Sequence, residues 1–165
     1  MRASRTREAL FLDARDDKHW MQILPATFLD LNALIKLERA CFGVDAWPLL
    51  DLIAVLTLAK VVRLKAVESA DMIGFAAGDP RPTEGFSWIA TIGVAPRFRR
   101  RGIGRELLRA CEARLSTPRL RLSVRLSNEA AIRLYREEGY VQVDLLHNYY
   151  KDGEAAIVMQ KSRAL

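Results

Sequence analysis

The most constraining feature of this chain is an apolar run that breaks into an arginine-rich loop with two glycines and then resumes at helical spacing. The apolar run, Phe86–Val94, predicts a buried strand that ends before Pro96. Apolar residues spaced three and four apart then predict a helix over residues 102–115. Glycines let a ligand approach the backbone closely, and the first-turn N–H groups of a helix lack internal partners. The pattern therefore predicts an anion site at the start of this helix.

The spacing of the glycines excludes two common phosphate-binding motifs. No Gly-Lys-Ser/Thr follows the loop, as in a P-loop, and Gly102-Ile103-Gly104 lacks the third glycine of a dinucleotide fingerprint. The run Arg99-Arg100-Arg101, taken alone, is typical of a solvated face. Taken with the strand and helix around it, residues 99–104 resemble the acyl-CoA pyrophosphate loop, Arg/Gln-x-x-Gly-x-Gly/Ala, of the GNAT superfamily of N-acetyltransferases.

A second block, about one strand downstream, carries the same resemblance. Residues 122–140 are similar to the family's strand-Asn-x-x-Ala-x-x-Leu-Tyr-x-x-x-Gly-Phe/Tyr segment, with Asn128, Tyr135 and Gly139 at its fixed positions. The resemblance extends from about residue 21 to residue 160. Asn148-Tyr149-Tyr150, followed by residues 153–159, resembles the end of the ribosomal-protein-alanine and protein N-terminal acetyltransferase branch.

The resemblance implies a single α/β domain of the GNAT type, with a mixed, mostly antiparallel, seven-stranded sheet. Helices cover both faces of that sheet, and its fourth and fifth strands splay apart. We expect a charged N-terminal leader over residues 1–20 and the acetyl-CoA-binding domain over residues 21–165. Apolar patterning predicts strands at 21–24, 61–67, 72–77, 86–94, 119–124, 141–146 and 154–161, helices at about 27–40, 48–58, 102–115 and 128–138, and a loop at 78–85.

A net charge of +6 raises the question of nucleic-acid binding. Much of the excess lies in one cluster, which consists of Arg97, Arg99, Arg100, Arg101, Arg105 and Arg109. The pyrophosphate and 3′-phosphate of coenzyme A account for such a cluster, whereas no zinc-finger spacing or aromatic-interleaved basic strand predicts a nucleic-acid reader. No uncharged apolar run of membrane-spanning length occurs. Cys41 and Cys111 are expected to be buried free thiols of a cytoplasmic protein, without a metal site.

The resemblance also assigns roles around the cofactor. It places the backbone N–H of Val94 on the thioester carbonyl, and Tyr135 as the general acid for the departing thiolate, with packing in the core as the alternative for this tyrosine. Gly93, inside the predicted strand, indicates a bulge or a close backbone approach. The expected cofactor-binding residues are Ile92, Val94, Arg99, Arg100, Arg101, Gly102, Ile103, Gly104, Arg105 and Asn128.

The general base is not evident from the sequence. Ser123 and Trp88 stand at the two positions where relatives place a base, and neither side chain accepts a proton at neutral pH. Deprotonation then uses water, another side chain or an amine that arrives neutral. The remaining candidates are Glu38, Asp45, Glu84 and His147.

This loss favours an α-amine as the acceptor. An α-amine has a pKa of about 7.8 and lysine one of about 10.4, so lack of a base costs lysine roughly 4 kcal/mol and an α-amine roughly 1 kcal/mol. The expected reaction is direct attack of a protein N-terminal amine on acetyl-CoA in a ternary complex. The enzyme is expected to be a monomer or a homodimer. A small-molecule amine and a catalytically impaired CoA-binding regulator are the alternatives. The resemblance frames the acceptor slot with Phe42, Gly43, Val44, Tyr149 and Tyr150.

Overall fold

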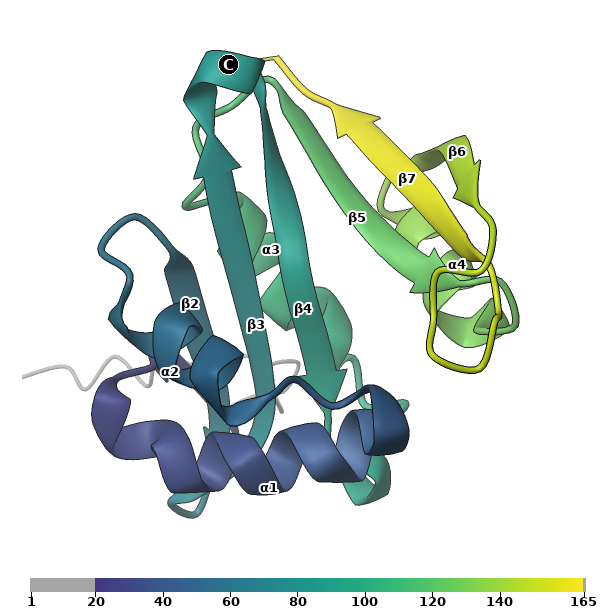
Figure 1. Cartoon of the computed structure of the whole chain (residues 1–165). Coiled ribbons are helices and arrows are strands. Elements are labelled where there is room, and N and C mark those ends of the chain that lie inside the picture. The colour runs from purple at the N-terminus through teal and green to yellow at the C-terminus, as the bar shows by residue number, and fades with distance from the viewer. Residues whose placement is uncertain (1–19, 165) are drawn as a thin grey trace, which may run out of the picture.

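The structure, a computed structural model, describes residues 20–164 and consists of one seven-stranded sheet with four helices (Figure 1). The expected leader, residues 1–20, lies outside the described residues except for Trp20. The strands are β1 Gln22–Pro25, β2 Val62–Glu68, β3 Asp71–Arg81, β4 Phe86–Val94, β5 Arg119–Arg125, β6 Val141–Leu146 and β7 Ala156–Ser162. The helices are α1 Leu31–Phe42, α2 Leu49–Thr57, α3 Ile103–Glu112 and α4 Glu129–Glu137, with short 3-10 turns η1 Phe28–Asp30, η2 Gly43–Asp45, η3 Pro82–Glu84 and η4 Pro96–Phe98.

The strand order is β1-β2-β3-β4-β5-β7-β6, and every neighbouring pair is antiparallel except β4 and β5. Helices α1 and α2 cover one face, and α3 and α4 cover the other (Figure 1). Each face has its own buried cluster, centred on Leu34 and Phe75 under α1 and on Leu107 and Leu120 under α3. The expected fold class, an α/β domain with a mixed sheet and helices on both faces, is confirmed.

The two parallel strands separate after a short contact. Only Ser87 with Leu120 and Trp88 with Arg121 pair across β4 and β5, although both strands continue beyond these residues. In the register with β3, Ala77 pairs with Thr91 and Gly78 with Ile89, so Ala90 is an extra residue in β4. Such a bulge bends the strand that contains it. The splay predicted for the fourth and fifth strands is therefore present, and it begins at this bulge (Figure 1).

The loop predicted at residues 78–85 is wrong for its first half, because β3 continues to Arg81. Proline disfavours a strand interior because it has no N–H to donate to the ladder. Here β2 begins at Val62, opposite Gly78, so Pro80 lies beyond β2 and pairs only with Ser87 of β4. Because β2 does not extend beyond Gly78, the lack of an N–H at Pro80 costs no hydrogen bond to β2. A turn, η3, then follows as far as Glu84.

Gly93 marks a close approach and not the bulge. A Cβ added there would lie 3.2 Å from the Cys41 Sγ and 3.3 Å from the Phe42 ring, so the end of α1 packs directly on the backbone of β4. Both cysteines are free, and Cys111 is buried as predicted, whereas Cys41 is only half-buried because it lies at this outer end of α1. No helix among residues 20–164 is long and apolar enough to cross a membrane.

Candidate functional site

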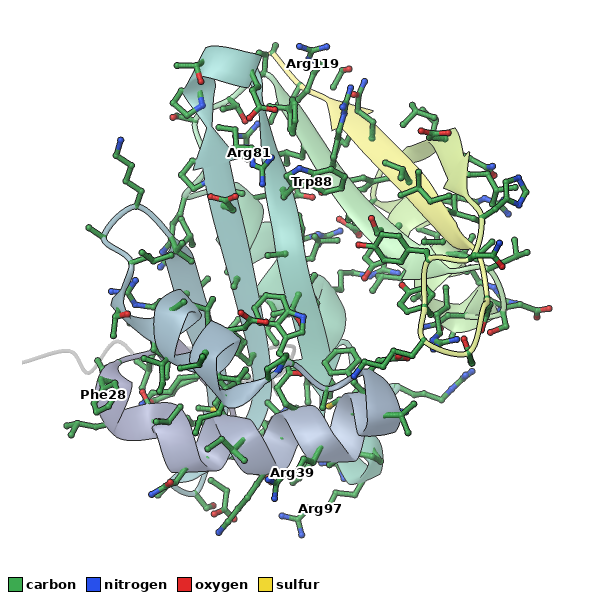
Figure 2. All side chains as sticks on the ribbon, viewed as in Figure 1. Phe28, Arg39, Arg81, Trp88, Arg97 and Arg119 are labelled. Carbon is green, nitrogen blue, oxygen red and sulfur yellow. The ribbon has the colours of Figure 1, made fainter. Side chains whose placement is uncertain are left out.

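The gap between β4 and β5 forms a cavity of about 250 Å³. Trp88 lies near its closed end, where the strands are still paired, and the gap widens toward α1 and the β6–β7 connection (Figure 2). The closed end is held by a buried hydrogen bond of 2.8 Å between the hydroxyls of Ser87 and Thr117. Six of the residues expected at the site line this cavity, namely Phe42, Ile92, Asn128, Tyr135, Tyr149 and Tyr150.

The open edge of β4 has a backbone N–H group, that of Val94, on the side of β5, although Val94 is not among the residues that line the cavity. The Ala95 N–H donates to the Ile73 carbonyl of β3 over 2.9 Å, and strand geometry turns the Val94 N–H to the opposite side, toward β5. The β4–β5 pairing has already ended at Trp88, so the sheet supplies this N–H with no partner strand. The Val94 carbonyl, on the same side, accepts a hydrogen bond of 3.1 Å from the Arg99 Nε. The edge thus retains a donor directed into the gap.

The arginine loop leads into α3 with a backbone that suits an anion. Gly102, the N-cap of α3, has φ +82°, in the left-handed region that favours glycine, and Arg100 has φ +63°. The first hydrogen bond within the helix runs from the Glu106 N–H to the Gly102 carbonyl, which leaves the preceding first-turn N–H groups without helical partners. A Cβ added to Gly104 would have only ordinary contacts, at 3.7 Å or more. The predicted strand–loop–helix anion site has the expected backbone geometry.

The arginine side chains, in contrast, are partly committed to other partners. Arg105 forms ion pairs with Glu137 and Glu138, and Arg109 donates to both oxygens of Glu138 at 2.8 and 2.9 Å. Hydrogen bonding from Arg109 lowers the pKa of Glu138 despite its burial. The charges of Arg105 and Arg109 are therefore shared with carboxylates of this chain, and their contribution to binding an anionic cofactor stays a prediction. Their side chains fasten α3 to the end of α4.

Arg97 and Arg101 also have contacts of their own. Arg97 lies 3.9 Å from Asp71 and 4.7 Å from the Phe98 ring, and Arg101 lies over the rings of Phe98 and Trp20. The cluster is thus a set of cations spread over α3, η4 and the loop between them. The expected anion site therefore depends on the backbone N–H groups of the loop more than on any single arginine side chain.

Tyr135 lies where either of the two roles considered for it in the sequence is possible. It lines the cavity from α4 and also packs edge-on against Tyr140, with ring centroids 5.9 Å apart. Burial, and then the neighbouring Tyr150, raise the pKa of Tyr135 to about 12. Its hydroxyl therefore stays protonated at every physiological pH. Asn128, at the start of the same helix, accepts a hydrogen bond from the Ala131 N–H over 3.2 Å and so caps α4.

The structure shows which of the four candidate bases lie at the cavity. Glu84 is exposed on η3 at the closed end of the sheet, and His147 is exposed after β6; neither lines the cavity. Asp45 lines it but accepts a hydrogen bond of 3.0 Å from the Arg125 Nε. Ser123, in the position where relatives place a base, does line the cavity.

Glu38 is buried next to the cavity, in α1. It accepts hydrogen bonds from the Trp47 N–H, at 3.2 Å, and from the Thr91 side chain, and both of these residues line the cavity. Burial raises the pKa of Glu38, and these two hydrogen bonds lower it in part. Glu38 was one of four candidates in the sequence, and its hydrogen-bond partners could not be predicted there because they come from two other segments of the chain.

Only some of the residues predicted to frame the acceptor slot line the cavity. Phe42, Tyr149 and Tyr150 reach the cavity, whereas Gly43 and Val44 lie beside it in η2, where 73% of Val44 is exposed. Sequence reasoning missed Arg125, which lines the cavity at the end of β5. In the sequence Arg125 is one of several arginines that alternate with buried residues on this strand, and this pattern is typical of a solvated face.

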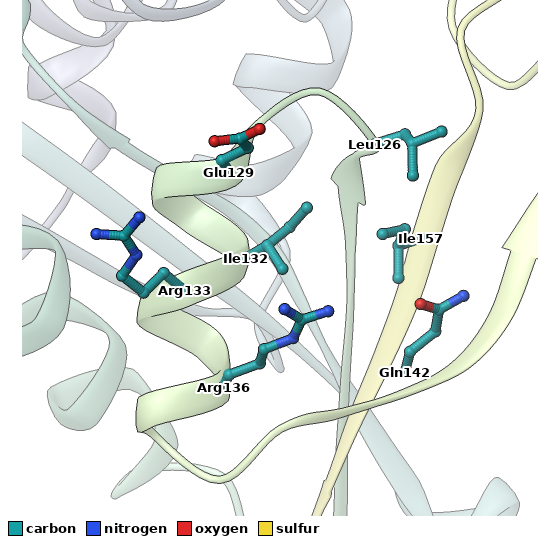
Figure 3. A pocket seen from close by; sticks show the side chains of 7 residues that line it. All are labelled: Leu126, Glu129, Ile132, Arg133, Arg136, Gln142 and Ile157. Atoms are coloured by element: carbon teal, nitrogen blue, oxygen red, sulfur yellow. The ribbon is translucent and has the colours of Figure 1, made fainter.

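A second, larger groove of about 470 Å³ lies against α4 (Figure 3). Ile132 and Arg136 of α4 face Gln142 of β6 and Ile157 of β7 across it. None of the residues expected at the site lines this groove. The smaller cavity between β4 and β5 is therefore the candidate site.

A sheet opened between parallel strands, next to a glycine loop at a helix N-terminus, is the arrangement that the resemblance to the N-acetyltransferases predicted. The chain belongs to the acetyltransferase (GNAT) family, whose profile matches residues 31–140. It is 34% identical over 141 residues to the N-alpha-acetyltransferase RimI of Mycobacterium tuberculosis, covering 82% of this chain and 88% of that protein. It is 28% identical to an N-alpha-acetyltransferase of Sulfurisphaera tokodaii, covering 90% and 96% of the two chains.

A solved structure supports the same branch. The ribosomal-protein-S18-alanine N-acetyltransferase of Escherichia coli matches with a TM-score of 0.78 and 27% identity, over 88% of this chain and 95% of that one. The predicted resemblance to the GNAT superfamily, and to its ribosomal-protein-alanine and N-terminal acetyltransferase branch, is confirmed.

The loop geometry predicts the effect of a side chain at Gly104. Gly104→Glu places a carboxylate beside the first-turn N–H groups of α3, where it competes with a phosphate, and we expect titration calorimetry to detect no binding of acetyl-CoA. Gly104→Ala is the matched control, because its Cβ meets only ordinary contacts, and it should bind with affinity close to that of the parent. Undiminished affinity in a folded Gly104→Glu variant would contradict this placement of the pyrophosphate.

Proposed function

We propose that this protein transfers an acetyl group from acetyl-CoA to the α-amine of a protein N-terminus, by direct attack in a ternary complex. The observation that carries the proposal is the cavity itself, which has the open β4 edge on one side and aromatic residues of two loop segments on the other. The names of the relatives support an α-amine acceptor. A side chain that would deprotonate lysine efficiently is missing at Ser123 and Trp88.

The residues present fit acetyl-CoA. The first-turn N–H groups of Ile103, Gly104 and Arg105, which have no partner within the helix, suit the pyrophosphate. Ile92, which lines the cavity, and Val94, two residues further along β4, are both partly exposed apolar residues that suit the pantetheine arm. The positively charged side chains of residues 99–101 supply long-range attraction.

Bound acetyl-CoA supplies a thioester whose carbonyl carbon bonds to the amine nitrogen while its carbon–sulfur bond breaks. The Val94 N–H donates a hydrogen bond to the carbonyl oxygen as negative charge gathers on it. Loss of one such donor costs roughly 3 kcal/mol in other enzymes. The amine loses one proton and the departing thiolate gains one, so the overall reaction is balanced.

Tyr135 is the donor for the departing sulfur. Proton transfer from a phenol of pKa about 12 to a thiolate whose thiol has a pKa of about 8.5 is uphill by about 5 kcal/mol. The hydroxyl therefore acts chiefly through its hydrogen bond to the developing thiolate, and the amine's proton reaches the sulfur afterwards. Deprotonation of the amine uses water or Glu38 through the Thr91 hydroxyl, and an α-amine needs this help less than lysine does.

Two synthetic peptides test the acceptor class. One has a free N-terminus and a dimethylated lysine, and the other has a blocked N-terminus and a free lysine. With acetyl-CoA, mass spectrometry should show acetylation of the first peptide at its α-amine and none of the second. Preferential acetylation of the lysine peptide, or of small amines over both peptides, would contradict the proposal, and binding of acetyl-CoA without any turnover would indicate a regulator.

The pH dependence of kcat/KM tests Tyr135 together with the amine. For the parent, kcat/KM should rise as the acceptor amine deprotonates and should show no fall below about pH 11, since the raised pKa keeps Tyr135 protonated. Tyr135→Phe should lower the whole curve by about 10²-fold without moving its rising limb or weakening acetyl-CoA binding. A change within about threefold would assign Tyr135 to packing alone. A rising limb fixed near pH 6–7 for amines of different pKa would identify a base of the enzyme, with Glu38 as the first one to test.

A further inference from the structure

Arg125 joins two segments of the chain that are far apart in sequence. At the end of β5, its Nε donates to the Asp45 carboxylate of η2 over 3.0 Å, and a second guanidinium nitrogen contacts the same oxygen. On its other side the guanidinium donates to Asp152, at 3.0 and 3.2 Å, and to Glu154. The Tyr150 ring lies 4.0 Å from its central carbon. One guanidinium is therefore shared between η2 and the β6–β7 connection.

A second tie links the same two segments. The Lys151 Nζ donates to the Val44 carbonyl over 2.9 Å, so a residue of the β6–β7 connection again contacts η2. The β6–β7 connection is closed on itself, because the N–H groups of Tyr149 and Tyr150 both donate to the Glu154 carbonyl at 3.1 Å. The contacts of Arg125 and Lys151 with η2, which we call the tether, therefore hold the whole β6–β7 connection and not one residue of it.

The two tethered segments are the walls of the cavity. Phe42 and Asp45 line it from the α1–α2 side, and Tyr149 and Tyr150 line it from the β6–β7 side. Only 22% of the Arg125 side chain and 17% of the Asp45 side chain are exposed, so solvent screens this pair less than a surface pair. The contacts of Arg125 strongly raise its own pKa, with Asp45 as the largest cause.

We propose that Arg125 is a positioning residue that fixes the separation of the two walls of the acceptor slot, and thereby selects an extended peptide over a small amine. The inference rests on the proposed acceptor class. A planar guanidinium is suited to this task because its N–H groups point in fixed directions, toward carboxylates on two sides. The ammonium of lysine, in contrast, is a single point charge. A small amine contacts the reacting centre only, so it gains little from correctly spaced walls.

Arg121 provides a matched control on the same strand. Its Nε donates to the Gln160 side chain over 2.8 Å, and its guanidinium lies 4.5 Å from the Phe86 ring, so it shares with Arg125 a side-chain hydrogen bond and a ring contact, with a neutral amide in place of the carboxylates. Both of these partners belong to the sheet, and neither belongs to a wall of the cavity. Arg121→Gln therefore removes an arginine from β5 without releasing either wall.

Steady-state kinetics of Arg125→Gln, Arg125→Lys and Arg121→Gln test the proposal, with an N-terminal peptide, an amino acid amide and acetyl-CoA as varied substrates. We expect Arg125→Gln to raise the KM of the peptide about tenfold or more and to leave the KM of acetyl-CoA and kcat/KM of the amide within about threefold. Arg125→Lys should recover only part of the loss, and Arg121→Gln should behave like the parent. Equal losses for all three substrates, or none, would overturn the proposal.

Two further measurements keep the test independent of folding and of the proposed function. Asp152→Asn removes one partner whose side chain is 55% exposed, so it should fold and show a smaller change in the same direction. Hydrogen exchange in the free protein should be faster at residues 43–45 and 149–154 in Arg125→Gln but not in Arg121→Gln. Unchanged exchange in Arg125→Gln would overturn the tether itself, whereas a parent that acetylates no peptide would refute the acceptor class alone.

Discussion

The early end of hydrogen bonding between β4 and β5 is the constraint on which the rest of the structure depends. Two residues of each strand pair, and beyond Trp88 the edge of β4 faces a gap in place of a strand. Unpaired backbone groups inside a protein are costly, so an open edge in the middle of a sheet persists only where the rest of the fold holds it open. The Ala90 bulge and the buried Ser87–Thr117 hydrogen bond fix where the opening begins. The open edge is where we propose that the thioester binds, with the Val94 N–H as its hydrogen-bond donor.

Helices on both sides of the gap position the side chains around it. The tight approach of α1 at Gly93 brings Phe42 and the buried Glu38 to one side, and α4 brings Tyr135 to the other. Arg105 and Arg109 hold α3 to the end of α4, so the anion site at the start of α3 and the hydroxyl of Tyr135 have a fixed relation. The cation cluster thus serves partly as an internal fastening, and its backbone forms the proposed anion site.

Local patterns predicted most of this architecture, and contacts between distant residues account for what they missed. Alternation and helical spacing identified seven strands and four helices, and the loop at residues 99–104 resembled a family motif because that motif consists of six consecutive residues. The extension of β3 through Pro80 depends on where β2 begins, which no pattern within β3 reveals. Arg125 lies 80 residues from Asp45, and the sequence carries no sign that these two charges meet. The commitment of Arg105 to Glu137 was missed for the same reason.

The central claim is that the open edge of β4 binds the thioester, with the amine entering between the two tethered walls. A crystal structure of the protein with acetyl-CoA tests it most directly. The account predicts the thioester carbonyl oxygen within hydrogen-bond distance of the Val94 nitrogen, about 2.7–3.2 Å, and the pyrophosphate on the first turn of α3. A thioester bound away from the β4 edge, for example in the groove between α4 and β6, would contradict it.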